Sequence, residues 1–208
     1  MTDWAAKRDS MVDALATRDD IGEETLAAMR AVPRHAFVPE GKRRAAYQDT
    51  PLPIGEGQTI SAPHMVAIMV DLLALQPGDT VLEIGTGCGY HAAVTAEVVR
   101  AENVSTVEYH DRLAADARET LADLGYGGVS VRAGDGKQGW AENAPYDRAY
   151  LTCAASSFPQ AVLEQVRPGG IVLAPIGDHS QVLVRARRRA DGALDREEHG
   201  RVRFVPLQ

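Results

Sequence analysis

Cysteine is scarce in this sequence. Only Cys88 and Cys153 occur among 208 residues. Two isolated cysteines provide neither the ligand spacing of a metal site nor the density of a disulfide framework. We therefore expect two free thiols and no metal centre.

Long hydrophobic runs are missing as well. No stretch approaches the ~18 consecutive apolar residues that a membrane-spanning helix needs. The segment from Met1 to Asp20 also lacks the apolar core of a signal peptide. These observations favour a cytoplasmic protein that does not bind membranes.

Lysine is rare, and acidic residues outnumber basic ones. Only Lys7, Lys42 and Lys137 are lysines among 22 basic residues, and the formal net charge is −7. A negative protein is a poor partner for nucleic acids, whose phosphates are bound by basic surfaces. A basic run at Arg185 and Arg187–Arg189 has the alternation of a solvent-facing strand. Scarce lysine with abundant acidic residues also suggests a salt-loving or GC-rich source organism.

The first third of the chain has the periodicity of helices. Two N-terminal helices are predicted by apolar residues at helical spacing: Met11, Leu15, Leu26 and Met29. The segment from Val32 to Pro63 is interrupted by proline and glycine and should resist regular structure. Such a long loop is typical of a lid or binding segment. A helix is expected over residues 64–75, with Ser61 placed to cap it and Pro63 in its first turn.

The rest of the chain alternates between strands and helices. Strands are predicted over residues 80–84, 104–108, 129–132, 146–152 and 170–175, and helices over 90–99, 111–124 and 160–166. This alternation predicts an α/β fold with a doubly wound, mostly parallel sheet. No helix separates the last two strand-like runs, 181–187 and 202–207, so they predict an antiparallel hairpin.

The segment Glu83–Tyr90 is a glycine-rich loop between a strand and a helix. Glycines there let a ligand approach the backbone near the helix N-terminus. Glu108 follows Gly89 by nineteen residues and ends the next strand, where a carboxylate can accept hydrogen bonds from ribose hydroxyls. The loop reads G-x-G-x-G, whereas dinucleotide sites use G-x-G-x-x-G. Glu83 ahead of the loop would repel a pyrophosphate, but it suits a ligand with ammonium and sulfonium groups. An NAD-linked dehydrogenase is therefore a poor alternative.

This arrangement resembles motif I of the Rossmann-like methyltransferases that use S-adenosylmethionine. Gly134–Gly136 resembles their adenine-contacting acidic loop. The resemblance implies S-adenosyl-L-methionine as cofactor and S-adenosyl-L-homocysteine as product. The cofactor-binding residues that it implies are Glu83, Gly85, Thr86, Gly87, Gly89, Glu108, Asp135 and Gly136. We expect a single methyltransferase domain over 1–208, with N-terminal helices and a substrate or lid segment (1–76), a cofactor-binding core (77–177) and a C-terminal hairpin (178–208).

Segments outside this loop resemble a particular family, the protein-L-isoaspartate O-methyltransferases. The segments that carry the resemblance are Val32–Pro39, Ala46–Ile54, Gly57–His64, Arg167–Gly170 and Phe204–Leu207. The resemblance implies methylation of the free carboxylate of L-isoaspartyl residues in damaged proteins and peptides. The ester would then close to a succinimide, whose hydrolysis returns some normal aspartate. The resemblance also places Ser61 at the substrate as the catalytic side chain, with Thr59 and Ile60 in the same substrate-binding loop.

The residues are compatible with that chemistry. A carboxylate is already ionised at neutral pH, so the reaction needs orientation more than it needs a general base. The Ser61 hydroxyl can donate to one carboxylate oxygen and orient the other. His64 is not required as a base and is expected to be packed or solvent-facing.

Three other functions compete with this interpretation. The main alternative is a methyltransferase that acts on another acceptor, a tRNA or a small molecule, because the fold and cofactor do not choose the acceptor. The negative charge weakens the tRNA version, and the segment from Val32 to Pro63 is not expected in a small-molecule enzyme. The other two alternatives are the dehydrogenase discussed above and a catalytically silent binding module. The intact motif residues argue against the silent module. The sequence does not determine the oligomeric state, for which a monomer is the default expectation.

Overall fold

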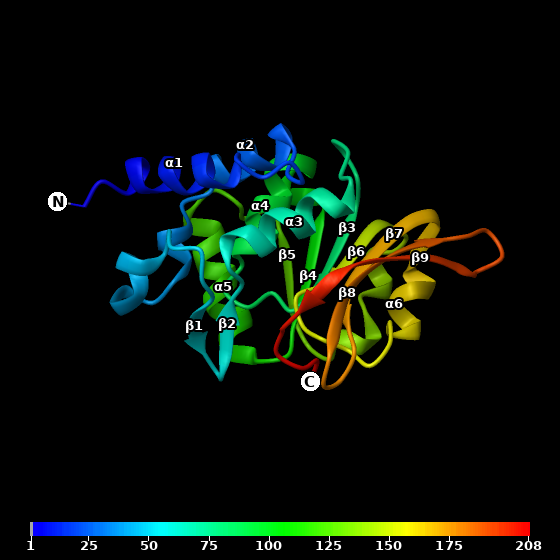
Figure 1. Cartoon of the computed structure of the whole chain (residues 1–208). Coiled ribbons are helices and arrows are strands. Elements are labelled where there is room, and N and C mark those ends of the chain that lie inside the picture. The colour runs from blue at the N-terminus through cyan, green and yellow to red at the C-terminus, as the bar shows by residue number, and fades with distance from the viewer. Residues whose placement is uncertain (1) are drawn as a thin grey trace.

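A seven-stranded sheet forms the centre of the molecule in a computed structural model that describes residues 2–208 (Figure 1). The strands lie in the order β5 (Ser130–Ala133), β4 (Val104–Glu108), β3 (Val81–Ile84), β6 (Tyr146–Leu151), β7 (Val166–Ile176), β8 (Gln181–Arg188) and β9 (Leu194–Val202). Strands β5 to β7 of this order are parallel, and β8 and β9 continue the sheet as antiparallel neighbours. The predicted doubly wound, mostly parallel sheet with a C-terminal hairpin is confirmed.

Helices cover both faces of the sheet. The α-helices are α1 (Trp4–Leu15), α2 (Glu23–Ala31), α3 (Pro63–Leu73), α4 (Tyr90–Val99), α5 (Asp111–Asp123) and α6 (Gln160–Gln165). Short 3-10 turns are η1 (Arg34–Phe37), η2 (Glu40–Ala45), η3 (Ala101–Asn103), η4 (Gly136–Gln138) and η5 (Ala141–Asn143). Residues of the first five α-helices share one core cluster, and α6 contributes Val162 to a second cluster. Along β3, Val81 belongs to the first cluster and Leu82 to the second, because successive side chains of a strand point to opposite faces.

The segment from Val32 to Pro63 is more regular than predicted. Besides η1 and η2 it contains an antiparallel hairpin of β1 (Leu52–Gly55) and β2 (Gln58–Ile60). Glu56 and Gly57 form its turn, both with positive φ (50° and 71°), as in the tight turns that match the twist of paired strands. The expectation of a segment without regular structure was wrong, since proline and glycine here end short elements and do not exclude them.

The C-terminal hairpin uses a different second strand from the one predicted. Strand β9 spans Leu194–Val202, a charged and largely exposed run, and the predicted strand over 202–207 was wrong. An edge strand needs only backbone pairing on one side, so the absence of apolar alternation did not prevent it. The apolar residues that follow instead cross the end of the sheet, where Val205 and Leu207 exchange 2.8 Å backbone hydrogen bonds with Ala154.

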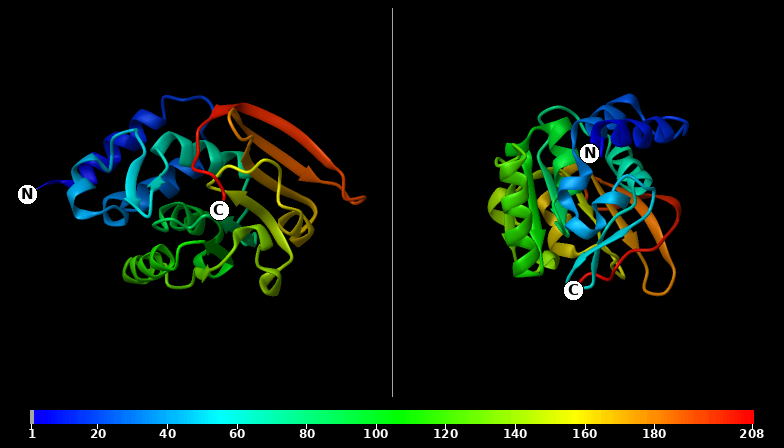
Figure 2. Two further views of the ribbon diagram at one scale, coloured as in Figure 1. Left: turned by 90° about the horizontal axis from the view of Figure 1, so that it is seen from below. Right: turned by 90° about the vertical axis from the view of Figure 1, so that its left-hand side faces the viewer.

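The C-terminal segment, residues 203–208, lies beside the β1–β2 hairpin, as the red and cyan ribbons of Figure 2 show, and residues of both line one cavity. In the part of the chain that the structure describes, no helix combines the length and apolar character required to cross a membrane.

Candidate active site

The glycine-rich loop connects β3 to α4 at the carboxyl edge of the sheet. Gly85 and Gly87 have φ values of 96° and 55°, which side chains with a Cβ rarely adopt. The Gly85 N–H donates to the Val107 carbonyl, and the Gly87 N–H donates to Glu108 Oε2, each at 2.8 Å. The loop is therefore held against the end of the neighbouring strand β4.

A cavity opens at this edge, where connections leave β3 in one direction and β6 in the other. Ligands bind at such a switch point in doubly wound sheets. Four of the predicted cofactor-binding residues line the cavity: Gly85, Gly87, Glu108 and Gly136. Sequence reasoning missed the other contributors, among them Gln58, Tyr109, His110, Thr152, Cys153 and Val205–Gln208. Thr152 and Cys153 could have been expected there, because they follow β6 and parallel strands end at one edge.

Four other predicted residues do not line this cavity. Gly89 lies at the start of α4, where an added Cβ would come within 3.1 Å of Leu121 on α5, so it serves helix packing. Asp135 is exposed and caps η4 by accepting from the Lys137 N–H at 2.9 Å. Glu83 lies beneath the loop, fully buried in β3. Thr86 lines a smaller neighbouring cavity.

Glu83 belongs to a buried network of hydroxyl groups. It accepts hydrogen bonds from Thr106 at 2.6 Å and Tyr150 at 3.0 Å, and the Thr106 and Thr86 hydroxyls lie 2.7 Å apart. Burial raises the pKa of Glu83 to about 8, against the weaker opposing effect of these donors. The carboxyl is therefore largely protonated at neutral pH. Through the Thr106 hydroxyl, Glu83 holds the Thr86 hydroxyl in place, and it presents no charge to the cavity.

A separate groove runs between the β2–α3 junction and the C-terminal segment. It encloses about 390 Å³, within the range of pockets that hold small ligands. Thr59 and Thr152 line this groove, the main cavity and the smaller cavity, and Ser61 lines the groove and the smaller cavity. The three spaces therefore meet at Thr59 and Thr152, and Ser61 lies beside them, where the groove meets the smaller cavity. The predicted substrate residues Thr59, Ile60 and Ser61 all lie at or beside this junction.

Ser61 does not cap α3, contrary to the prediction. The N-cap position is Ala62, and Asp49 supplies the capping oxygen by accepting from the His64 N–H at 3.0 Å. The Asp49 carboxylate also lies 2.8 Å from His64 Nδ1. The half-buried His64 side chain is therefore paired with this carboxylate. An acidic residue from another segment has thus taken the capping role, which leaves the Ser61 hydroxyl available to the groove.

The backbone of Ser61 is held by Arg34, a residue to which sequence reasoning assigned no role. Arg34 is fully buried, and its Nη2 donates to the Ser61 carbonyl at 2.7 Å while Nε donates to the Ala46 carbonyl at 2.8 Å. Its guanidinium lies 4.8 Å from the centre of the Tyr90 ring. Arg34 therefore connects the loop that carries Ser61 to the helix that follows the glycine loop.

Three buried titratable side chains near the junction, His91, Cys88 and Cys153, are uncharged at neutral pH. Burial lowers the pKa of His91 to about 3. It also raises the pKa of Cys88 to about 11 and that of Cys153 to about 12. Cys88 and Cys153 therefore provide no thiolate for nucleophilic catalysis, and His91 provides no imidazolium for acid catalysis. Both cysteines are free, and residues 2–208 contain no cluster of three or more metal-ligating side chains.

Comparison with known proteins decides the family. The model of the protein-L-isoaspartate(D-aspartate) O-methyltransferases matches residues 6–208. The chain belongs to this family. Membership confirms the resemblance inferred from the sequence motifs, and it makes the chain a methyltransferase that uses S-adenosylmethionine.

Individual relatives agree over nearly the whole length. The chain is 49% identical over 207 residues to protein-L-isoaspartate O-methyltransferase 2 of Archaeoglobus fulgidus, covering 99% of this chain and 94% of that protein. A solved protein-L-isoaspartate O-methyltransferase superimposes with a TM-score of 0.89 at 27% identity, over 97% of this chain and 66% of the longer one. A beta-aspartate methyltransferase of Plasmodium falciparum, solved with S-adenosyl-L-homocysteine, shares the fold with a TM-score of 0.83 at 24% identity, over 97% of this chain and 98% of that one.

Proposed function

We propose that this chain transfers a methyl group from S-adenosylmethionine to the free carboxylate of L-isoaspartyl residues in damaged proteins and peptides. The ester then closes to a succinimide, and repair begins. The observation that carries the proposal is the junction at Thr59, Ser61 and Thr152. There the cavity at the glycine loop, suited to the cofactor, meets the groove, suited to a peptide. We place the activity in the cytoplasm, together with the proteins that it would repair.

The residues of the main cavity fit the cofactor. Gly85 and Gly87 keep side chains out of the cavity, and the Glu108 carboxylate lies at the end of β4, within reach of ribose hydroxyls. Gly136 completes the lining, while Glu83, Thr86, Gly89 and Asp135 act by holding the loops in place. When bound, the cofactor supplies an electrophilic methyl group on a sulfonium sulfur.

The protein's own contribution is orientation of the acceptor. An isoaspartyl carboxylate is ionised at neutral pH, so no proton has to be removed before transfer. Ser61 donates a hydrogen bond to one carboxylate oxygen and so directs the other toward the junction. The hydrogen bond from Arg34 to the Ser61 carbonyl fixes the position of the Ser61 backbone. The protonated thiols of Cys88 and Cys153 and the neutral imidazole of His91 agree with a reaction that needs no base or nucleophile from the enzyme.

The first test is transfer of labelled methyl from S-adenosylmethionine to an isoaspartyl peptide, with its normal aspartyl twin as control. We expect base-labile label on the isoaspartyl peptide alone. Runs at low and at molar KCl also test the salt-loving habitat, which steady loss of activity with added KCl would contradict. Label on neither peptide at any salt concentration, in protein that binds the cofactor, would redirect the search to tRNA and small molecules. If those acceptors also failed, a silent binding module would remain.

A further inference from the structure

Two arginines line the acceptor groove without partners of their own. Arg201 and Arg203 lie at the end of β9 and just beyond it, and both are exposed. Among residues 2–208, neither makes an ion pair or a side-chain hydrogen bond. The arginines of β8 differ, since Arg185 donates to the Leu72 carbonyl and Arg188 to the Val166 carbonyl.

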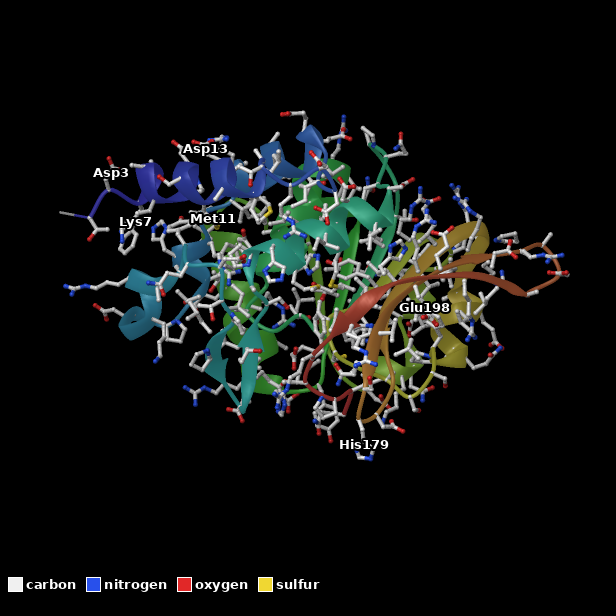
Figure 3. The ribbon with its side chains drawn as sticks, in the orientation of Figure 1. Asp3, Lys7, Met11, Asp13, His179 and Glu198 are labelled. Atoms are coloured by element: carbon white, nitrogen blue, oxygen red, sulfur yellow. The ribbon has the colours of Figure 1, made fainter. Side chains whose placement is uncertain are left out.

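The groove is basic although the whole chain carries a net charge of −7. Its lining contains Arg201, Arg203 and His64 but no aspartate or glutamate. Two carboxylates on neighbouring elements are paired with other side chains: Asp49 with His64 of the lining, and Glu197 with Arg185. Figure 3 shows Glu198 on β9 to the right of the arrowhead in which the strand ends, whereas the groove begins at that end.

From this charge distribution we infer that the groove selects isoaspartyl sites with acidic neighbours. The inference rests on the proposed function and adds a substrate class to it. A groove of one sign in a protein of the opposite sign attracts complementary peptides and repels basic ones. Arg201 and Arg203 are then specificity-determining residues that attract the acidic side chains flanking the isoaspartate.

The geometry limits where those acidic neighbours lie. Val205 lines both the groove and the cofactor cavity, and Arg203 precedes it by two residues and Arg201 by four. An extended chain spans at most about 3.6 Å per residue, so the two Cα atoms lie within about 7 and 14 Å of Val205. A peptide bound in an extended conformation beside this segment has the same length per residue. Acidic residues within roughly four positions of the isoaspartate are therefore favoured, and more distant ones are not.

The test compares isoaspartyl peptides that carry glutamate, glutamine or lysine two to four positions from the isoaspartate. At low salt we expect kcat/KM for the glutamate peptide to exceed that for the lysine peptide about three- to tenfold, as exposed charge pairs allow. The preference should vanish in 1 M KCl, where the screening length falls to about 3 Å. The double variant R201Q/R203Q should lose the preference, so that its kcat/KM values for the three peptides become equal. R189Q, at the hairpin tip outside the groove, is the matched control and should keep it.

Equal kcat/KM values for the three peptides would overturn the inference, and so would a preference that persists in R201Q/R203Q. Methylation of the glutamine peptide separates this failure from that of the proposed function. If even that peptide receives no methyl group, the proposed function fails, and the inference fails with it.

Discussion

The Ser61 hydroxyl is the side chain on which the proposed orientation of the acceptor depends. Replacing Ser61 with alanine removes one hydrogen bond to a charged group, so we expect kcat/KM for an isoaspartyl peptide to fall about 10- to 100-fold. Affinity for S-adenosylhomocysteine, measured by calorimetry, should stay within about twofold, because Ser61 does not line the main cavity. S10A, on the exposed face of α1, is the control. Unchanged turnover in S61A would remove this residue from the mechanism.

Arg34 is predicted to act on the reaction through the position of Ser61. A lysine retains the charge but cannot direct two N–H groups in the fixed fork that serves the Ser61 and Ala46 carbonyls. We expect R34K to lower kcat at least tenfold while its affinity for S-adenosylhomocysteine changes little. Steady-state kinetics together with thermal unfolding distinguish this from a loss of folded protein. A folded R34K with the kcat of the parent would contradict the positioning role.

The buried carboxyl of Glu83 should make stability depend on pH. Its pKa is about 8 in the folded state and near the ordinary 4.5 in the unfolded state, so the folded state binds more protons between these values. The Glu83 contribution is complete below pH 4.5 and is lost as the pH rises through 8. The free energy of unfolding of the parent, minus that of E83Q, should therefore fall between pH 5 and pH 8.

Urea unfolding of both proteins at pH 5, 6.5 and 8 measures this difference. His91 has the opposite dependence, because its pKa falls to about 3 and its contribution is lost as the pH drops below 6.5. His91 is present in both proteins, so its effect cancels in the difference. A difference that does not vary with pH would show that Glu83 is ionised in the folded state.

At the scale of elements, the C-terminal segment forms one wall of the cofactor cavity, and a side chain of β8 fixes the start of that wall. Gln181 of β8 accepts from the Phe204 N–H at 2.6 Å and donates to the Phe204 carbonyl at 3.1 Å, just before the residues that line the cavity. Loss of both bonds in Q181A should weaken binding of S-adenosylhomocysteine about three- to tenfold. Q76A, at the opposite edge of the sheet, should bind normally. Equal calorimetric affinities in the two variants would mean that Gln181 does not hold this wall.

At the scale of the whole molecule, the single domain predicted over residues 1–208 has a thermodynamic signature. Two apolar clusters lie on opposite faces of the same sheet and share its strands, so they should unfold together. S-adenosylhomocysteine at 100 times its dissociation constant should add about 2.7 kcal/mol to the free energy of unfolding. Calorimetry should then show one transition that moves upward by roughly 5–10 °C. Two transitions, of which only one moves, would contradict a single cooperative unit.

Local patterns explain why much of the fold could be predicted. The helix at Tyr90–Val99 and the strand at Val104–Glu108 have the predicted boundaries, and Asp111–Asp123 differs from its prediction by one residue. Periodicity, caps and glycine turns act over a few residues and are therefore written in the sequence itself. The glycine loop and Glu108 could be placed for the same reason, since parallel strands bring their carboxyl ends to one edge.

The order of the elements, the class of sheet and the loop that marks a cofactor site thus follow from local sequence patterns. Tertiary structure alone decided that Arg34 holds Ser61, 27 residues away, that Asp49 takes over the capping of α3, and that Val205 joins Thr59 and Thr152 at the junction. It also decided that the charged run Leu194–Val202 pairs with β8. These outcomes depend on contacts between segments that are distant in the sequence. Backbone hydrogen bonds and the shape of the packed core determine which segments pair, and local side-chain patterns do not predict that pairing.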